Sequence, residues 1–167
     1  MPISTIGQNG LQQSRILTAV QQPAGAVLQV VQGYLGGTAV WSTTSSTPSD
    51  IGLSATITPT FATSRVLVIV QITQINSTGG NATGGAFRLL KNGTTVVAFE
   101  SATGYSTATN ETDCYVAGSG TSYLDSPATT SALTYKIQGW RSNGSNTIRL
   151  HPAGDGYSTI ILMEIAT

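Results

Sequence analysis

Hydrophobic and polar residues alternate over several stretches of this chain. Leu53, Ala55 and Ile57 alternate with polar residues ahead of a proline. The segment 132–140 repeats the pattern, with Leu133 and Ile137 among its regularly spaced apolar positions. A period of two places successive side chains on opposite faces of a strand, so both segments are predicted to be half-buried strands.

Two other segments are apolar without clear alternation. Residues 27–34 are rich in valine and are predicted to be a strand, and residues 65–73 (RVLVIVQIT) are almost continuously apolar. A continuous apolar run of this length is typical of a strand that is buried on both faces. The segment 75–86, rich in Gly, Asn, Ser and Thr, is predicted to be a loop.

The dipeptide Asn92-Gly93 lies between two short apolar segments, 87–91 and 95–99. Both residues tolerate a positive φ, which makes this a strong signal for a tight β-hairpin. Further strands are predicted at 113–117, 120–124, 147–150 and 157–165. Eight to ten short strands with almost no helix indicate an all-β fold, a jelly-roll-like β-sandwich.

The first 25 residues differ from the rest of the chain because they are rich in Gln and show no alternation. Residues 11–22 could form a short helix, although about twelve residues are marginal for a helix in isolation. We interpret 1–25 as an N-terminal attachment arm that becomes ordered on docking, followed by a jelly-roll domain at 26–167. A disordered tail or an additional edge strand are the alternatives for the arm.

Charge is scarce: seven Lys and Arg and seven Asp and Glu occur among 167 residues, with a net charge of zero. Soluble domains usually carry about a quarter charged residues. A neutral surface with few charges favours association, and seven scattered basic residues do not make the patch that nucleic acid requires. The only cysteine, Cys114, excludes an intrachain disulfide, and no apolar run is long enough to span a membrane.

Few residues could support catalysis or hold a metal. His151, the only histidine, lies near Asp155, but no nucleophile motif accompanies the pair. Glu111 and Asp113 are the only closely spaced carboxylates that we weigh as an acid–base pair, and with Asp125 they could form a calcium site. We instead interpret these as solvated loop charges and expect a protein that is not an enzyme and has no cofactor or metal.

Aromatic side chains are the remaining candidates for recognition. They could stack on sugars or on a protein partner, but we expect most of them to fill the core or a subunit interface. The residues concerned are Trp41, Tyr105, Tyr115, Tyr123, Trp140 and Tyr157.

Four segments in this order resemble a group of bacteriophage virion surface proteins, chiefly from phages of cyanobacteria: VLQVVQ at 27–32, GLSATITPTFATSRVLVIVQI at 52–72, FRLLKNGTTV at 87–96 and DSPATTSALTYKIQ at 125–138. The last two also resemble the trimeric jelly rolls of complement globular heads and tumour-necrosis-factor-like proteins. The resemblance covers about 26–166. It implies a homotrimeric jelly roll on a virion, either a capsid cement (decoration) protein or a tail-fibre knob.

The short arm and the lack of a long shaft repeat favour the capsid cement protein. Such a homotrimer would stabilise the phage head by bridging subunits of the major capsid protein, with no contact to nucleic acid or membrane. It would be made in the host cytoplasm and reside on the capsid surface. The alternative is a receptor-binding knob that recognises a host surface glycan through loops 76–85 and 101–112, and a third hypothesis is a depolymerase with a carboxylate site between subunits.

Two groups of residues are predicted to carry the structural function. The arm is expected to contact the capsid through Ile3, Ile6, Leu11, Arg15, Ile16, Leu17 and Val20. The trimer interface or the core is expected to include Val68, Val70, Ile72, Tyr135, Ile137, Ile161 and Met163.

Overall fold

Ten β-strands make up the part of the chain that the structure, a computed structural model, describes: residues 23–37, 41–78, 83–99, 113–151 and 154–167, with the backbone alone from 113 to 117. The strands are β1 (Val27–Gly37), β2 (Trp41–Thr43), β3 (Ser49–Ile57), β4 (Arg65–Thr78), β5 (Gly84–Lys91), β6 (Thr94–Phe99), β7 (Asp113–Asp125), β8 (Leu133–Asn143), β9 (Ile148–Leu150) and β10 (Gly156–Ile165). Within these residues, no helix has the length and apolar character needed to cross a membrane.

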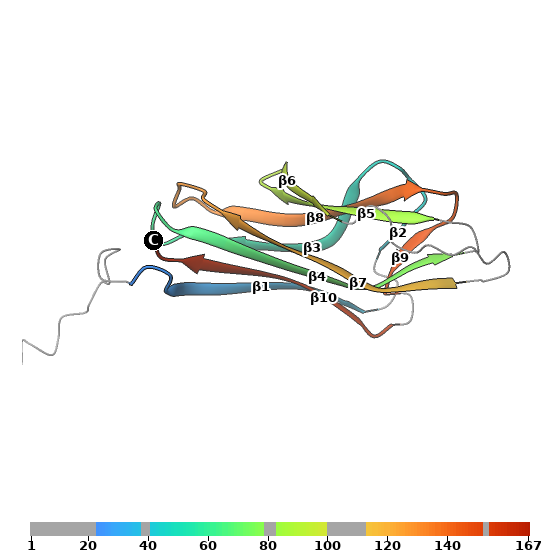
Figure 1. Cartoon of the computed structure of the whole chain (residues 1–167), viewed down its shortest axis with the longest axis horizontal. Helices are drawn as coiled ribbons and strands as arrows, with labels where there is room; N and C mark the ends of the chain where they lie inside the picture. Colours follow the sequence, from blue (N-terminus) through green and yellow to red (C-terminus); the bar gives the residue numbers. More distant parts are fainter. Residues whose placement is uncertain (1–22, 38–40, 79–82, 100–112, 152–153) are drawn as a thin grey trace, which may run out of the picture.

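Eight long strands form two antiparallel sheets that lie face to face (Figure 1). Sheet A has the order β1-β10-β4-β7, and the short strands β9 and β2 extend it beside the far end of β4. Sheet B has the order β3-β8-β5-β6. The first long strand pairs with the last, and the connections cross repeatedly between the sheets, which is the topology of a jelly roll. The predicted all-β jelly-roll fold is therefore confirmed.

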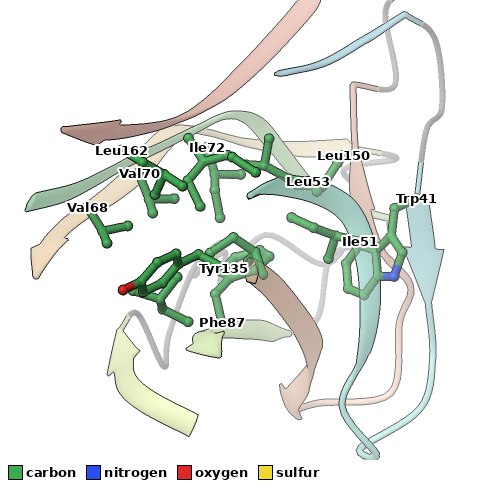
Figure 2. Packing of buried hydrophobic residues seen from close by; sticks show 14 of the residues in the cluster. Trp41, Ile51, Leu53, Val68, Val70, Ile72, Phe87, Tyr135, Leu150 and Leu162 are labelled. Carbon is green, nitrogen blue, oxygen red and sulfur yellow. The ribbon is translucent and has the colours of Figure 1, made fainter. Parts of the chain in front are cut away.

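The core lies between the two sheets and follows from the alternation in the sequence. In β3, Ile51, Leu53, Ala55 and Ile57 are buried while the residues between them are exposed. Figure 2 shows Tyr135 of sheet B among the apolar side chains packed between the sheets. In β3 and β8, every second side chain thus points into the core.

The predicted hairpin between β5 and β6 is confirmed. Asn92 and Gly93 have φ angles of +47° and +87°, as a type I′ turn requires of its two central residues. At the opposite edge of the sandwich, a Cβ atom at Gly33 in β1 would collide with the carbonyl oxygen of Ser54 in β3. A glycine is needed there because β1 and β3 approach each other so closely.

Some predicted boundaries were wrong. The loop expected at 75–86 is shorter, because β4 continues to Thr78 and β5 begins at Gly84. The polar end of β4 pairs with β7 on one edge and with β9 on the other, and this pairing overrides its loop-like composition. The two strands expected at 113–117 and 120–124 form the single strand β7, and β2 was not predicted.

Candidate interaction surface

The outer face of sheet A carries a row of apolar side chains that crosses four strands. Val30 lies opposite Met163, which lies opposite Leu67, which in turn lies opposite Leu124. The next row holds Ile161 opposite Ile69. These six residues, called the apolar face below, are Val30, Leu67, Ile69, Leu124, Ile161 and Met163.

The apolar face is open to solvent in the described part of the chain. Val30 is 56% exposed and Leu124 is 48% exposed, and the other four members are partly buried. The sequence predicted that 65–73 is buried on both faces. This was wrong for the single chain, because Val66, Val68 and other inward residues of β4 are buried while its outward residues are not fully covered.

Charged side chains are absent from the centre of this surface. The outward positions of the next row are Tyr34, Thr159, Gln71 and Gly120, so none of the three described rows contains a charge. Arg65 lies at the end of β4, beyond the row that contains Leu67. An apolar centre without charges is the composition found at the core of protein interfaces.

Two tyrosines form an aromatic ledge beside the apolar face. The rings of Tyr34 in β1 and Tyr157 in β10 stack with their centroids 5.4 Å apart and an interplanar angle of 14°. Both side chains are largely exposed, at 66% and 52%. Tyrosines at this kind of position contribute strongly to protein association, since a large ring is buried at a low entropic cost.

The residues predicted for the core or the trimer interface fall into two groups. Five lie buried between the sheets: Val68, Val70, Ile72, Tyr135 and Ile137. The other two, Ile161 and Met163, are partly buried members of the apolar face. Five residues of this surface were not named from the sequence: Val30, Tyr34, Leu67, Ile69 and Leu124. The spacing of Val30 and Tyr34 along one strand was a usable signal.

The predicted capsid contacts at positions 3, 6, 11, 15, 16, 17 and 20 lie outside the described residues, as does most of the arm. The same holds for the proposed recognition loop 101–112, and therefore for Tyr105 and Glu111. In the other proposed recognition segment, 76–85, Asn76 and Ser77 are buried strand residues, which corrects their expected exposure on a loop.

The aromatic residues divide between the core and the surface. Trp41 is a core residue, and Tyr123 packs partly buried against the core. Trp140 is partly buried on the outer face of sheet B, and Tyr157 belongs to the aromatic ledge. For Tyr115, only the backbone is described.

Asp125 is not available to bind calcium as considered from the sequence. Its carboxylate is buried and accepts hydrogen bonds from Lys91 Nζ (2.8 Å) and from the Tyr135 hydroxyl (2.6 Å). Burial, followed by the hydrogen bond to Asp125, raises the pKa of Tyr135 far above its ordinary value. Among the residues described, no three His, Cys, Asp or Glu side chains come close enough to hold a metal ion.

The only histidine is buried. His151 Nε2 lies 2.9 Å from Ser158 Oγ, but both side chains are fully buried, whereas Asp155 is exposed. Ser158 Oγ also accepts a hydrogen bond from the backbone N–H of Thr73. This pair links the residue that follows β9 to β10 and, through the N–H of Thr73, to β4.

Glu164 is a second buried carboxylate whose hydrogen bonds connect parts of the fold. It accepts hydrogen bonds from Gln29 Nε2 (2.6 Å) and from the backbone N–H groups of Thr60 (2.7 Å) and Phe61 (3.2 Å). Burial raises the pKa of Glu164, but the hydrogen bonds outweigh it and hold the pKa below its ordinary value. The carboxylate therefore fastens β10 to β1 and to the turn that joins the two sheets.

No known protein family matches the sequence, and a comparison with curated proteins gives no match. Among solved structures, the chain is similar to the TNF Eiger from S. frugiperda, with 14% identity and a TM-score of 0.43 over 82% of this chain and 93% of that chain. It is also similar to the VP2 subviral particle of infectious bursal disease virus, with 11% identity and a TM-score of 0.43 over 83% of this chain and 38% of that chain. The Gt strain of the same virus gives 13% identity and a TM-score of 0.41 over 87% and 40%. These are TNF-like and viral capsid chains, and the fold assignment itself rests on the strand order.

Proposed function

We propose that this chain is a non-enzymatic structural protein of a bacteriophage particle, which forms a homotrimer and stabilises the head by bridging capsid subunits. The observation that carries the proposal is the apolar face of sheet A together with its aromatic ledge. Such a surface is unfavourable in contact with water and favours association with a partner that covers it.

Copies of the same chain are the partner that the chemistry favours. The net charge of the chain is zero, so copies do not repel each other through their overall charge. The three central rows of the surface present no charge that would be desolvated on contact. A trimer is favoured over a dimer because 87–96 and 125–138 resemble segments of trimeric jelly rolls.

Four segments between 27 and 138 resemble phage surface proteins, and this resemblance favours the virion as the location of the protein. In this proposal the arm 1–25 contacts the major capsid protein, using the apolar residues and Arg15 named above. An arm that becomes ordered on binding can cover a wide surface at the cost of its own conformational entropy.

A structural role agrees with the environment of two acidic groups, Asp125 and Glu164, and of the histidine. Asp125 and Glu164 are buried and occupied by hydrogen bonds, and His151 is buried against Ser158. General acid–base catalysis needs such groups within reach of a substrate. Their partners instead connect strands within the sandwich.

The mass of the full chain in solution tests the assembly. Light scattering coupled to size exclusion should give three times the 17.2 kDa of one chain. Ile69→Lys should give monomers, because it would bury a charge in the interface. Thr95→Lys, at an exposed position on the edge strand β6, is the matched control and should remain trimeric. A wild-type chain that stays monomeric at micromolar concentrations would refute the trimer.

Phage particles with and without the protein test the proposed role on the head. Particles that lack it should release their DNA at a lower temperature, and added wild-type protein should restore stability. A chain without residues 1–25 should still form trimers but should fail to bind the particles. Equal heat stability of both particles, or density for the protein at the tail tip alone, would contradict the capsid role.

A further inference from the structure

The outer face of sheet B differs from that of sheet A because polar side chains on it form one connected chain. Arg88 Nη2 donates to Gln138 Oε1 (2.6 Å), and Gln138 Nε2 donates to Asp50 Oδ1 (2.7 Å). Lys136 Nζ donates to Asp50 Oδ2 (2.8 Å). These four residues, called the polar chain below, come from β5, β8 and β3 and contain both donors and acceptors.

A small pocket of about 70 Å³ opens beside the polar chain. It is lined by Asp50, Gly52, Leu53, Ser54, Lys136 and Ile137. Its position follows from an irregularity in the pairing of β3 with β8, where the register shifts between Asp50 and Ser54. Gly52 has a φ of +92° at this shift, a conformation that favours glycine. Irregularities of this kind bend a strand and are common next to binding sites.

Asp50 and Lys136 keep hydrogen-bonding capacity for a ligand. The side chain of Asp50 is 51% exposed and that of Lys136 is 32% exposed, although they form an ion pair. The hydrogen bonds from Lys136 and then Gln138 hold the pKa of Asp50 below its ordinary value. The carboxylate is therefore ionised at neutral pH and can accept further hydrogen bonds beside an ammonium group that can donate them.

Trp140 extends the same surface along β8. It lies two residues beyond Gln138 on the same face, about 7 Å away along the strand. Trp140 is partly exposed, and Arg88 Cζ lies 6.0 Å from the centroid of its ring. An aromatic ring, a carboxylate, an amide and an ammonium group thus lie along one strip between β3 and β5.

This combination fits one class of ligand better than the others. A metal ion would need more than the single carboxylate at the pocket. Nucleic acid would need a basic surface, whereas the positive charges here are partly balanced by Asp50. A sugar offers hydroxyl groups that donate and accept hydrogen bonds, together with an apolar C–H face that packs on an aromatic ring.

We propose that the outer face of sheet B is a binding site for a neutral saccharide, with hydroxyl groups at Asp50 and Lys136 and a neighbouring sugar ring on Trp140. The two ends of the strip, Lys136 and Trp140, are about 14 Å apart along β8, so the ligand spans more than one sugar unit. The site lies on a strand face rather than on the loops that the sequence suggested for glycan recognition. It is on the sheet opposite the apolar face and does not depend on the proposed trimer.

The full chain is tested first against an array of neutral and anionic oligosaccharides and then by calorimetric titration with the neutral ones that bind. We expect weak binding, with a dissociation constant of about 1 mM, that does not change with salt. Binding should also protect Trp140 from a soluble fluorescence quencher, while Trp41 is buried in either state.

Asp50→Asn should weaken binding about tenfold, because it removes a charged acceptor. Trp140→Leu should weaken it by a similar factor through the loss of stacking. Asp155→Asn is the matched control, since this exposed carboxylate lies just before β10 of the other sheet and does not line the pocket, and it should bind as the wild type does. An unchanged circular dichroism spectrum and an unchanged mass confirm that each variant is folded and assembled.

Three results would overturn the proposal: no neutral saccharide binds at about 10 mM, binding is unchanged in both Asp50→Asn and Trp140→Leu, or only anionic saccharides bind with strong salt dependence. The mass of the assembly separates these failures from a failure of the proposed function. A trimer that binds no saccharide would refute only the saccharide site, and a monomer that binds saccharide would refute only the trimer.

Discussion

The carboxylate of Glu164, near the end of β10, accepts hydrogen bonds from both the backbone N–H (2.7 Å) and the hydroxyl group (3.0 Å) of Thr60. Thr60 lies in the turn between β3 of sheet B and β4 of sheet A. A single buried charge therefore connects the last strand to the crossover between the sheets. Gln29 of β1 donates to the same carboxylate, so three parts of the fold meet at this group.

We expect Glu164→Gln to lower the free energy of unfolding by about 2 kcal/mol, because hydrogen bonds to an ionised group are stronger than those to an amide. Urea denaturation at a fixed protein concentration measures the difference. Asp155→Asn, which neutralises an exposed carboxylate, should change stability by less than about 0.5 kcal/mol. Equal losses in the two variants would contradict a specific role for Glu164.

The pH dependence of the free energy of unfolding should also reveal the contribution of the Glu164 carboxylate. The folded-state pKa of Glu164 is below its ordinary value of 4.5, so its contribution is complete above pH 4.5 and is lost as the pH falls through the folded-state pKa. The melting temperature of the wild type should therefore decrease as the pH is lowered below 4.5. Glu164→Gln should show a shallower decline in this range, and parallel curves would argue against the carboxylate as the cause.

His151 should produce a separate step at higher pH. Burial lowers the pKa of His151 below 6.5, although a backbone hydrogen bond involving Gly37 opposes this effect. Its contribution to stability is thus complete above pH 6.5 and is lost as the pH falls through the folded-state value. His151→Asn should remove this step, and Asn suits the position because residue 151 has a φ of +53°. A step that persists in His151→Asn would assign it to another group.

Tyr135→Phe tests the other buried carboxylate, Asp125, which connects the end of β7 in sheet A to β8 in sheet B. Removal of the hydroxyl leaves Asp125 with Lys91 but without its 2.6 Å hydrogen bond, and we expect a loss of about 1–3 kcal/mol in the free energy of unfolding. Thermal unfolding of the variant beside Tyr34→Phe provides the comparison. Tyr34 is exposed, so its loss of a hydroxyl should have little effect. Similar melting temperatures for the two variants would count against this role of Asp125.

Tyr34→Ala should act on assembly rather than on the fold of one chain. The variant removes half of the stacked pair with Tyr157, and truncation of an interface aromatic typically costs about 2 kcal/mol or more in association. Sedimentation of dilute samples should show dissociation at a concentration at least tenfold higher than for wild type. Thr95→Ala, at an exposed position on β6 of the other sheet, is the control. Equal dissociation of both variants would exclude the aromatic ledge from the interface.

Local patterns in the sequence predict a strand well where only one face of that strand packs against the core. The alternation in β3 predicts which of its residues are buried, since only that face meets the core. Asn92 and Gly93 predict the hairpin because few residues tolerate the two positive φ angles of its turn.

The sequence predicts the structure less well where pairing between segments far apart in the chain determines it. The polar end of β4 is a strand because β7 and β9 hydrogen-bond to both of its edges, and no local signal contains that information. The apolar face also depends on register. Val30 and Leu67 are 37 residues apart in the sequence and come into one row because β10 lies between their strands. The polar chain on sheet B has the same origin, since Arg88, Gln138 and Asp50 belong to three separate strands.

The pairing of the first long strand with the last has a consequence for synthesis of the chain. Gln29 and Glu164, which bond across this pair, are 135 positions apart. At about 5–20 residues per second, the ribosome needs on the order of 10 s to make the intervening segment. Because β10 separates β1 from β4, sheet A cannot close before its last-made strand emerges. A chain that stops before Gly156 would therefore lose an inner strand of sheet A and be left for chaperones and proteases.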